Sequence, residues 1–581
     1  MAEQAVHPSP RHGTGIASSV ARDPVLLGVR ILVTLALFLM AMPIALLVLS
    51  SLREGTLVEP GAFTLQNFRN ILEHPAFLGT IGNTLLLGVG SVVVMLAFAL
   101  PFAWLYSRTN LPGKGVFLAL LTSNVAMPGF TVAMGYVLLL NPSNGVLNQA
   151  LRQAFNLSGP VFDIYGLGWM IVLQGLALVP PAFFMIVPTL QAIDTSLEEA
   201  AAASGVRRYM TTLRIVFPLA APAILATAIY YFIIAIETFD YASMLGFPVR
   251  TYVVSTWLYQ LMYPGSDLPQ YGDAAALGIL TTIFALGLGA VFIWATRRAS
   301  RYIVMTGKRR QQTRTELGRA WAVIAWAVIL LYVFFALLLP LAMLAWASVV
   351  PFIQPPSMRA LQTVTLNAYT EAWSQFGELA YNNGVAMLAV PTIAVAFAAC
   401  ISWFGARSKS VWRPTLEIFL VCAIAVPSIV SAVAFLYFGL ASYKFLPIYG
   451  TIWLIVLAMA IRYVTWANRS ISSAMMQVHP EMEEACTASG IPRGRAFVSV
   501  TLPVVRPALL FSWFWIALLT LRELTIPVML ARPNTQTIST AIWGFSVAGN
   551  ADIASALSII LVALIAVLLL AFSRFAKNLS L

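Results

Sequence analysis

The sequence predicts an all-α, polytopic membrane protein with about twelve transmembrane helices in two parallel six-helix repeats. Hydrophobic residues make up 60% of the 581 residues and charged residues 10%, with a mean hydropathy of +0.85. Soluble domains carry about a quarter charged residues. Apolar runs long enough to cross about 30 Å of hydrocarbon recur along the chain. One polar stretch between these runs occurs twice.

The apolar runs fall into two groups of six. Those of the first half lie near 25–50, 79–106, 117–140, 166–190, 219–245 and 274–296. Those of the second half lie near 320–348, 380–405, 415–440, 450–472, 506–530 and 554–573. We therefore expect a disordered N-terminus at 1–24, a first membrane domain at 25–297, a basic linker at 298–319 and a second membrane domain at 320–581.

A long-period internal repeat relates the two halves. The stretch from Glu198 to Gly205 recurs 285 positions later, from Glu483 to Gly490. Between 198–224 and 483–509, ten of 27 positions are identical, where ordinary composition gives roughly two by chance. Both halves enter the membrane in the same order, so we expect a parallel repeat.

Each copy predicts a helix, a glycine turn and a second helix between two spans. Glu and Ala favour helix, and Gly205 and Gly490 stand where a helix commonly ends in a left-handed residue. Pro218 and Pro503 then suit the first turn of a new helix. An acidic loop without function explains one such copy, but not two copies with the same glycine-to-proline spacing.

The pattern Glu-Ala-Ala, three residues, Gly and then a hydrophobic–proline pair resembles the cytoplasmic coupling loop of binding-protein-dependent ABC importer permeases. The resemblance covers about residues 25 to 575, and the fused arrangement resembles the ferric-iron, aminoethylphosphonate and thiamine branches. It implies two permease domains whose loops dock on a separate ATPase. The implied coupling residues are Glu198, Glu199, Ala200, Gly205, Pro218, Glu483, Glu484, Ala485, Gly490 and Pro503.

The resemblance also implies partners and location. A cytoplasmic ABC ATPase dimer supplies the energy, so ATP is used by the partner and no cofactor is expected in this chain. A soluble periplasmic binding protein captures the substrate, because no outer loop is large enough for a binding domain. The expected substrate is ferric iron or aminoethylphosphonate, and the expected location is the bacterial inner membrane, as a multi-pass protein in the lipid bilayer.

The placement of Lys and Arg predicts the orientation. Loops on the side of the two Glu-Ala stretches carry 23 of these residues and the opposite loops carry seven. Both termini and the linker at 298–319 are therefore expected in the cytoplasm. The net charge of +12 is interpreted as this orientation signal, and no nucleic-acid partner is expected.

The sequence shows no catalytic or metal-binding motif. It contains no GxxxxGK[ST] phosphate loop, its four histidines are dispersed, and its three cysteines form no CxxC or Cys/His cluster. We therefore expect no enzymatic activity, no catalytic residue and no metal site.

Four charged residues within predicted spans are candidates for a functional site, because an ionisable residue near the bilayer centre costs about 2.5–3.5 kcal/mol unless it has a partner or a polar cavity. They are Glu237 and Asp240 in the fifth span and Arg522 and Glu523 in the eleventh. At the offset of 285, Glu237 corresponds to Arg522, so we expect Glu237 to pair with Arg522, or to lie near the adjacent Arg522 and Glu523 together, at the interface of the halves. All four are candidates for a translocation path or gate, with a structural ion pair or water-reaching residues as the alternative. Arg462 in the tenth span is expected to snorkel or to pair locally.

Two other classes of protein are alternatives. A gradient-driven secondary carrier also has repeats and twelve spans, but it does not need two glycine–proline cytoplasmic elements. A structural membrane protein leaves both elements unexplained. Co-elution of the purified chain with an ATPase discriminates the importer from both.

The predicted orientation can be tested by cysteine labelling from the periplasmic side. Probes at Ser300, Gln312 and Ser580 should stay unlabelled, and probes at Gly55, Ser266 and Asn550 should react, because Lys and Arg mark the cytoplasmic loops. Labelling of the linker from outside would overturn the orientation.

Overall fold

The computed structural model describes residues 23–579, apart from 56–59, 195, 207, 266–267, 300–314, 408–415, 417–418, 421–422 and 424–425. The all-α prediction is confirmed, because strands occur in the described residues only as a hairpin of β1 (Arg53–Gly55) and β2 (Pro60–Phe63). Nine described helices are long and apolar enough to cross a membrane, and one bent pair makes up to ten. The protein is polytopic.

The first half runs from α2 to α14. Its helices are α2 (Pro24–Ser51), α3 (Gln66–Glu73), α4 (Phe77–Arg108), α5 (Lys114–Ser123), η1 (Asn124–Ala126), α6 (Gly129–Leu140), α7 (Val146–Phe155), α8 (Leu167–Ala192), α9 (Ser196–Ala203), α10 (Arg208–Thr211), η2 (Thr212–Val216), α11 (Phe217–Ile236), α12 (Asp240–Gly246), η3 (Phe247–Val249), α13 (Val254–Met262) and α14 (Tyr271–Ala299).

The second half runs from α15 to α27. Its helices are α15 (Arg319–Val333), η5 (Phe334–Leu338), α16 (Leu339–Ala347), α17 (Met358–Gln362), α18 (Asn367–Arg407), α20 (Ser428–Ser442), α21 (Ile452–Met476), α22 (Glu481–Ala488), α23 (Arg493–Ala496), η6 (Phe497–Thr501), α24 (Leu502–Arg522), α25 (Thr525–Leu530), η7 (Pro533–Thr535), α26 (Ile538–Val547) and α27 (Ala551–Leu579).

The two halves correspond at more than one offset. From α8 and α21 onward the offset is 285, since α8 begins at Leu167 and α21 at Ile452. For α6 and α20 it is 299, since α6 follows Pro128 and α20 follows Pro427. The difference of 14 positions falls between α6 and α8, where the first half carries α7.

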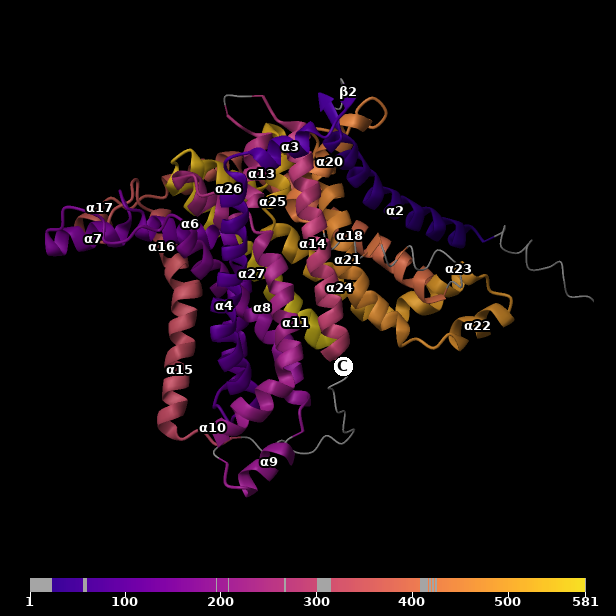
Figure 1. Ribbon diagram of the computed structural model, residues 1–581, viewed down its shortest axis with the longest axis horizontal. Helices are drawn as coiled ribbons and strands as arrows, with labels where there is room; N and C mark the ends of the chain where they lie inside the picture. The colour runs from indigo at the N-terminus through magenta and orange to yellow at the C-terminus, as the bar shows by residue number, and fades with distance from the viewer. Residues whose placement is uncertain are drawn as a thin grey trace, which may run out of the picture.

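The first helix of each half packs against the other half. Helix α2 packs on α20 and α23 of the second half, and α16 packs on α6 of the first (Figure 1). The approach of α6 and α16 is close, because a Cβ on Gly135 would lie 2.7 Å from the Pro340 carbonyl oxygen. The larger apolar core therefore draws on both halves.

The start of α2 is fastened to the second half by one buried carboxylate. Asp23 caps α2 by accepting a hydrogen bond from Leu26 N at 3.1 Å, and it accepts a second from Gly494 N at 2.7 Å. A Cβ on Gly494 would lie 2.5 Å from Leu26 N. Glycine is therefore needed at this crossing for steric reasons.

Three spans predicted as continuous are broken. The span at 117–140 bends by 87° between Ala126 and Gly129. The span at 219–245 is interrupted between α11 and α12, and the span at 506–530 between α24 and α25. Length and apolarity show that a run can cross a membrane, but they do not show where its helix breaks. The described part of the span at 415–440 is mainly α20, and α21 covers the span at 450–472.

Pro218 and Pro503 lie in the first turn of α11 and α24, as predicted. A π-helical turn, η2 or η6, joins each of these helices to the short helix before it. This wider turn accommodates the missing proline N–H and the clash of the ring with the preceding turn.

Candidate functional site: two Glu-Ala helices and two proline breaks

The repeated stretches form two short surface helices, as predicted. Helices α9 and α22, here called the Glu-Ala helices, lie in the lower part of Figure 1, away from α3, α13 and α26. No residue of α22 is buried, and Glu484 and Ala485 are exposed. Ala200 on α9 is exposed as well, and the side chain of Glu199 lies outside the described residues.

Both Glu-Ala helices end in the predicted glycine turn. Gly205 has φ +77° and Gly490 has φ +85°. Val206 N donates to Ala201 O and Ile491 N to Cys486 O, each at 3.0 Å. This six-to-one bond is typical of a Schellman C-cap, in which the left-handed residue is usually glycine. No atom lies within 4 Å of a Cβ built on either glycine, so the backbone conformation alone disfavours other residues.

An arginine holds one glutamate of each Glu-Ala helix, the first of the repeated Glu-Glu pair. Arg108, at the end of α4, forms an ion pair with Glu198 at 2.8 Å and donates to Ile193 O at 2.9 Å. In the second half, Arg407 at the end of α18 pairs with Glu483 at 3.2 Å and donates to Val478 O at 2.7 Å.

These arginine clamps were missed because only the 285 offset was applied to charged residues. Arg108 and Arg407 are 299 positions apart, whereas Ile193 and Val478 are 285 apart. The match of Pro128 with Pro427 carried the signal for the second offset. In the sequence analysis, Arg108 and Arg407 entered only the count of Lys and Arg that predicts orientation, so no partner was predicted for them.

In two equivalent spans of the repeat, a helix begins directly after a proline. Helix α6 starts after Pro128 and α20 after Pro427, so each proline leaves carbonyls before it and amides after it without helical partners. Here these two positions are called the proline breaks. Such groups need partners inside a membrane protein, because hydrocarbon supplies none.

Charged side chains form hydrogen bonds with the free backbone carbonyls and amides at the proline breaks. At the second proline break, Glu237 accepts from the Ser428 backbone N–H, and Arg462 donates to the Val426 carbonyl. Glu237 and Arg462 also form an ion pair at 2.8 Å, with side chains 11% and 14% exposed.

At the first proline break, Asp240 accepts from the Phe130 backbone N–H. Arg522 donates to the Met127 carbonyl at 3.4 Å. A Cβ on Gly129 would lie 2.9 Å from an Asp240 carboxylate oxygen, so glycine admits the carboxylate to this helix start. Acidic groups at helix N-termini are stabilised by the exposed amides and the helix dipole.

The predicted pairing of Glu237 with Arg522 is wrong, although their equivalence holds. Each reaches across to the proline break of the other half: Glu237 to the start of α20, and Arg522 to the carbonyl before α6. The carboxylate meets amides and the guanidinium meets carbonyls, because those are the groups each can hydrogen-bond. The ion-pair partner of Glu237 is Arg462, the residue expected to snorkel or to pair locally.

Glu523 completes the charged region. It accepts from the Tyr463 hydroxyl at 2.8 Å and from Ile526 N at 3.3 Å, the latter in the first turn of α25. The carboxylate of Glu523 is also near enough to repel the like charges of Asp240 and Glu237. All four residues singled out in the sequence therefore belong to one connected region.

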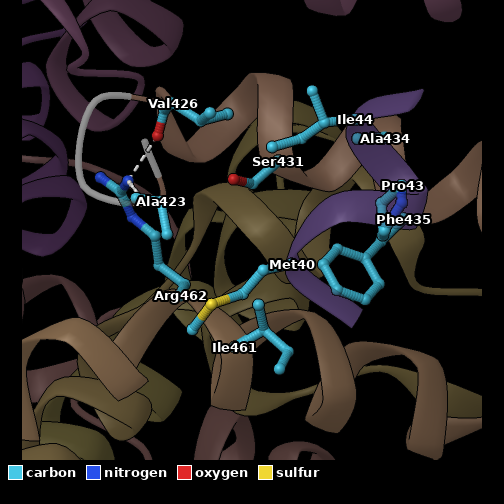
Figure 2. Close-up of a pocket in the computed structure, with 10 residues that line it drawn as sticks. All are labelled: Met40, Pro43, Ile44, Ala423, Val426, Ser431, Ala434, Phe435, Ile461 and Arg462. Carbon is cyan, nitrogen blue, oxygen red and sulfur yellow. Dashed lines mark hydrogen bonds between the residues drawn. The ribbon is translucent and has the colours of Figure 1, made fainter. Parts of the chain in front are cut away.

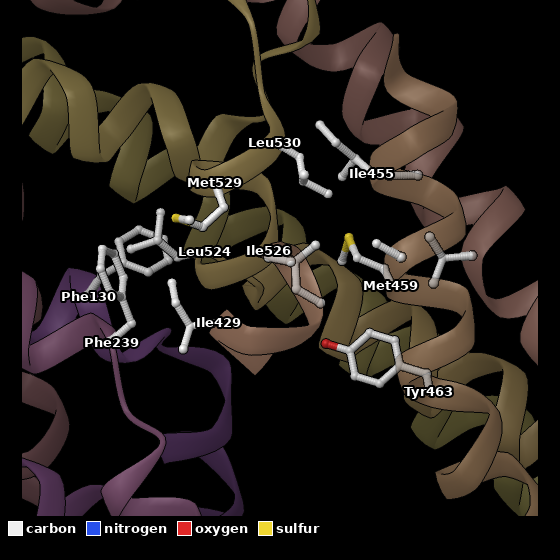
Figure 3. Close-up of a cluster of buried hydrophobic side chains, with 14 of the residues drawn as sticks. Phe130, Phe239, Ile429, Ile455, Met459, Tyr463, Leu524, Ile526, Met529 and Leu530 are labelled. Carbon is white, nitrogen blue, oxygen red and sulfur yellow. The ribbon is translucent and has the colours of Figure 1, made fainter. Parts of the chain in front are cut away.

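An apolar quartet lies at the same breaks. Phe130 and Ile429 are equivalent at the offset of 299, and Phe239 and Leu524 at the offset of 285. All four are at most 1% exposed and belong to one buried cluster (Figure 3). Phe239 also meets Trp543 of the second half, with ring centroids 6.5 Å apart. The apolar quartet therefore fills the region where the broken helices of the two halves approach each other.

A small cavity lies beside Arg462, between α2, α20 and α21 (Figure 2). Its lining is mostly apolar, with Ser431 and Arg462 as the polar members. The guanidinium turns away from Met40 and Ile461 toward Val426, as the dashed line in Figure 2 shows. Arg462 therefore lines the cavity, but its guanidinium group points toward the Val426 carbonyl and not into the cavity. Within the described residues, no three His, Cys, Asp or Glu side chains gather in a way that could hold a metal ion.

Comparison with known proteins agrees with this architecture. Residues 392–580 match the family "Binding-protein-dependent transport system inner membrane component". The chain is similar to the putative ferric transport system permease protein FbpB 1 of Haemophilus influenzae, with 25% identity over 498 residues, or 82% of this chain and 73% of that protein. It is also similar to the putative 2-aminoethylphosphonate transport system permease protein PhnU of Salmonella typhi, with 25% identity over 267 residues, or 44% of this chain and 86% of that protein.

Among solved structures, a bacterial alginate ABC transporter in complex with a pentasaccharide-bound periplasmic protein aligns with 50% of this chain. The alignment covers 99% of that chain at a TM-score of 0.37 and 20% sequence identity.

The repeated fold and the matched relatives define a class of transport protein: multi-pass inner-membrane permeases of binding-protein-dependent systems. The matches support the interpretation of this chain as a fused double permease of an ABC importer, with both permease halves in one polypeptide.

The corrected ion pair can be tested by a double-mutant cycle. Glu237→Gln and Arg462→Gln should each destabilise the purified protein, because removing one partner of a buried pair leaves a charge uncompensated, at a cost of about 3–5 kcal/mol. The double variant should lose less than the sum, with a coupling of about 0.5–3 kcal/mol in SDS-unfolding titrations. The control is a second double-mutant cycle, of Glu237→Gln with Arg522→Gln, whose coupling free energy should be smaller than that of the first cycle. A larger coupling in that second cycle would contradict the assigned pair.

Proposed function

We propose that the chain forms the translocation pathway of an ABC importer and that the Glu-Ala helices couple it to a separate ATPase dimer. The observation that carries this proposal is the pair of surface helices, each closed by the same glycine turn and held by an arginine clamp. Two equivalent docking elements fit two ATPase subunits, because a parallel repeat presents the same element twice. ATP is then hydrolysed by the partner.

The remaining partners follow from the same class. A soluble periplasmic protein delivers the substrate to the end of the bundle opposite the Glu-Ala helices. The orientation proposed from Lys and Arg puts both termini and residues 298–319 in the cytoplasm, on the side of the ATPase. A gradient-driven carrier remains the rival, and it gives no reason for two exposed helices of this kind.

We propose ferric iron as the substrate, with aminoethylphosphonate as the alternative. The ferric permease relative aligns with 82% of this chain, and the aminoethylphosphonate relative with 44%. The charged region at the proline breaks also contains three carboxylates, Glu237, Asp240 and Glu523, and two guanidinium groups, Arg462 and Arg522. The excess of carboxylates suits a cationic cargo better than an anionic one.

We further propose that the proline breaks form the gate of the pathway. The apolar quartet closes the interface between the halves, while Glu237, Asp240, Arg522 and Glu523 hold the broken helices in place. Rocking of the halves separates Glu237 from α20 and Arg522 from α6, because both contacts cross the interface.

The coupling proposal predicts a graded effect at the glycine turns. Gly205→Val or Gly490→Val should lower substrate-stimulated ATP hydrolysis in proteoliposomes of the full complex, because a β-branched residue resists positive φ. Asn tolerates the left-handed conformation better, so Gly205→Asn and Gly490→Asn should retain more stimulation.

The matched control is Gly115→Val on α5, where a Cβ meets nothing within 4 Å and φ is not positive. This variant should behave as the wild type. Full stimulation in both Val variants would refute coupling through these turns.

The substrate proposal predicts which loaded binding protein activates the complex. The permease should be reconstituted with its ATPase and with the soluble binding protein encoded beside it. Binding protein loaded with ferric iron should stimulate ATP hydrolysis, and the same protein offered 2-aminoethylphosphonate should not. If only 2-aminoethylphosphonate stimulated ATP hydrolysis, the proposal of ferric iron would be wrong and aminoethylphosphonate would be the substrate. Failure of any ATPase to co-elute with the chain would favour the secondary carrier.

A further inference from the structure

The second long helix of each half, α4 or α18, is fastened to other elements at two places. At the end near the Glu-Ala helices, Arg108 and Arg407 are the arginine clamps described above. The second place carries asparagines at equivalent positions: Asn83 lies near the start of α4, and Asn382 lies within α18, 15 positions after its first residue.

These asparagines hold the backbone of the segments that follow the broken spans. Asn83 donates from its side-chain amide to Tyr252 O at 3.0 Å. Asn382 donates to Gln536 O at 2.9 Å and to Asn534 O at 3.3 Å. Tyr252 and Gln536 lie just before α13 and α26.

The neighbouring residues add a further bond at each place. Thr84 accepts from Val254 N at 2.9 Å, and the side-chain oxygen of Asn383 accepts from Ile538 N at 3.4 Å. Thr84 and Asn383 are buried, as is Asn382. Two hydrogen bonds therefore join α4 to the backbone around the start of α13, and three join α18 to the backbone around the start of α26.

The spacing between the two fastenings is the same in both halves. Arg108 follows Asn83 by 25 positions, and Arg407 follows Asn382 by 25 positions. A helix of that length spans about 37 Å at 1.5 Å per residue, which is more than the thickness of the hydrocarbon. Each of α4 and α18 remains one helix across its internal proline, Pro101 or Pro391.

We propose that α4 and α18 transmit movement of the Glu-Ala helices to the segments beyond the proline breaks, with Arg108, Arg407, Asn83 and Asn382 as positioning residues. The inference rests on the proposed coupling to an ATPase. A displacement of α9 or α22 pulls its clamped glutamate, and the arginine passes the displacement to the helix. The asparagine at the second place then moves the backbone next to α13 or α26. No residue of this chain needs to touch substrate for that role.

The two clamps differ in their contacts. Glu483 also accepts hydrogen bonds from Trp403 Nε1 at 3.2 Å and from the Thr501 hydroxyl. Its side chain is 12% exposed, against 21% for Glu198. The ion pair itself is longer in the second half, 3.2 Å against 2.8 Å. Variants of α18 are tested first because all the partners named for Glu483 lie within the described residues.

The test compares transport with ATP hydrolysis in proteoliposomes of the full complex. Arg407→Gln and Asn382→Ala should each lower the substrate transported per ATP about five- to tenfold, a usual size for a lost coupling between sites. Asn382→Ala, which does not touch a Glu-Ala helix, should also leave assembly with the ATPase and ATP hydrolysis in place. The two fastenings act in series, so the double variant should be no worse than the more damaged single variant.

The matched control is Arg69→Gln, which removes an exposed ion pair with Glu73 on α3 and should change nothing. Arg108→Gln and Asn83→Ala repeat the test on α4 if an α18 variant does not assemble. Unchanged transport per ATP in the single variants, or losses that multiply in the double variant, would overturn the inference. If the wild-type chain stimulates no ATPase, the proposed function itself fails and the inference falls with it.

Discussion

The structure depends on how two proline breaks inside an apolar bundle are stabilised. Each break exposes carbonyls and amides, and one charged side chain from each half satisfies them: Asp240 and Arg522 at the first break, Glu237 and Arg462 at the second. Isolated charges in a membrane are costly, and so are unpaired backbone groups. Bringing Glu237 to amides and Arg522 to carbonyls removes both costs together. The same contacts hold the two halves against each other, because each crosses the interface.

This constraint explains why the broken helices, the charges and the apolar quartet occur in one place. Prolines end the helices, Phe130 and Ile429 follow them, and Phe239 and Leu524 stand at the breaks of α11 and α24. A boundary held by hydrogen bonds and closed by large apolar side chains can exchange between two packings without unfolding either half. Part of the first span of each half packs against the other half: α2 against α20, and α16 against α6. These contacts keep the halves joined during such a movement.

Much of this architecture could be predicted from the sequence, and the rest could not for identifiable reasons. Apolar length showed the membrane class, and the repeat showed two halves with glycine-closed surface helices, because both features are local in the chain. The partner of Glu237 could not be predicted, since Arg462 corresponds to Ala177 in the first half and the repeat therefore holds no equivalent of this pair. The arginine clamps were missed because an insertion of 14 positions between α6 and α8 shifts one part of the repeat against the other. Breaks within apolar spans depend on tertiary partners and leave little trace in composition.

The central claim is that the pathway passes through the proline breaks and is closed there by the apolar quartet. The most direct measurement is the reactivity of single cysteines, placed at Phe239 and Leu524 in a variant without native cysteines, toward a membrane-impermeant thiol reagent. These cysteines should be protected in the resting complex and should react from one side only when nucleotide closes the ATPase. Protection of both positions in every nucleotide state, in a complex that transports normally, would contradict the account.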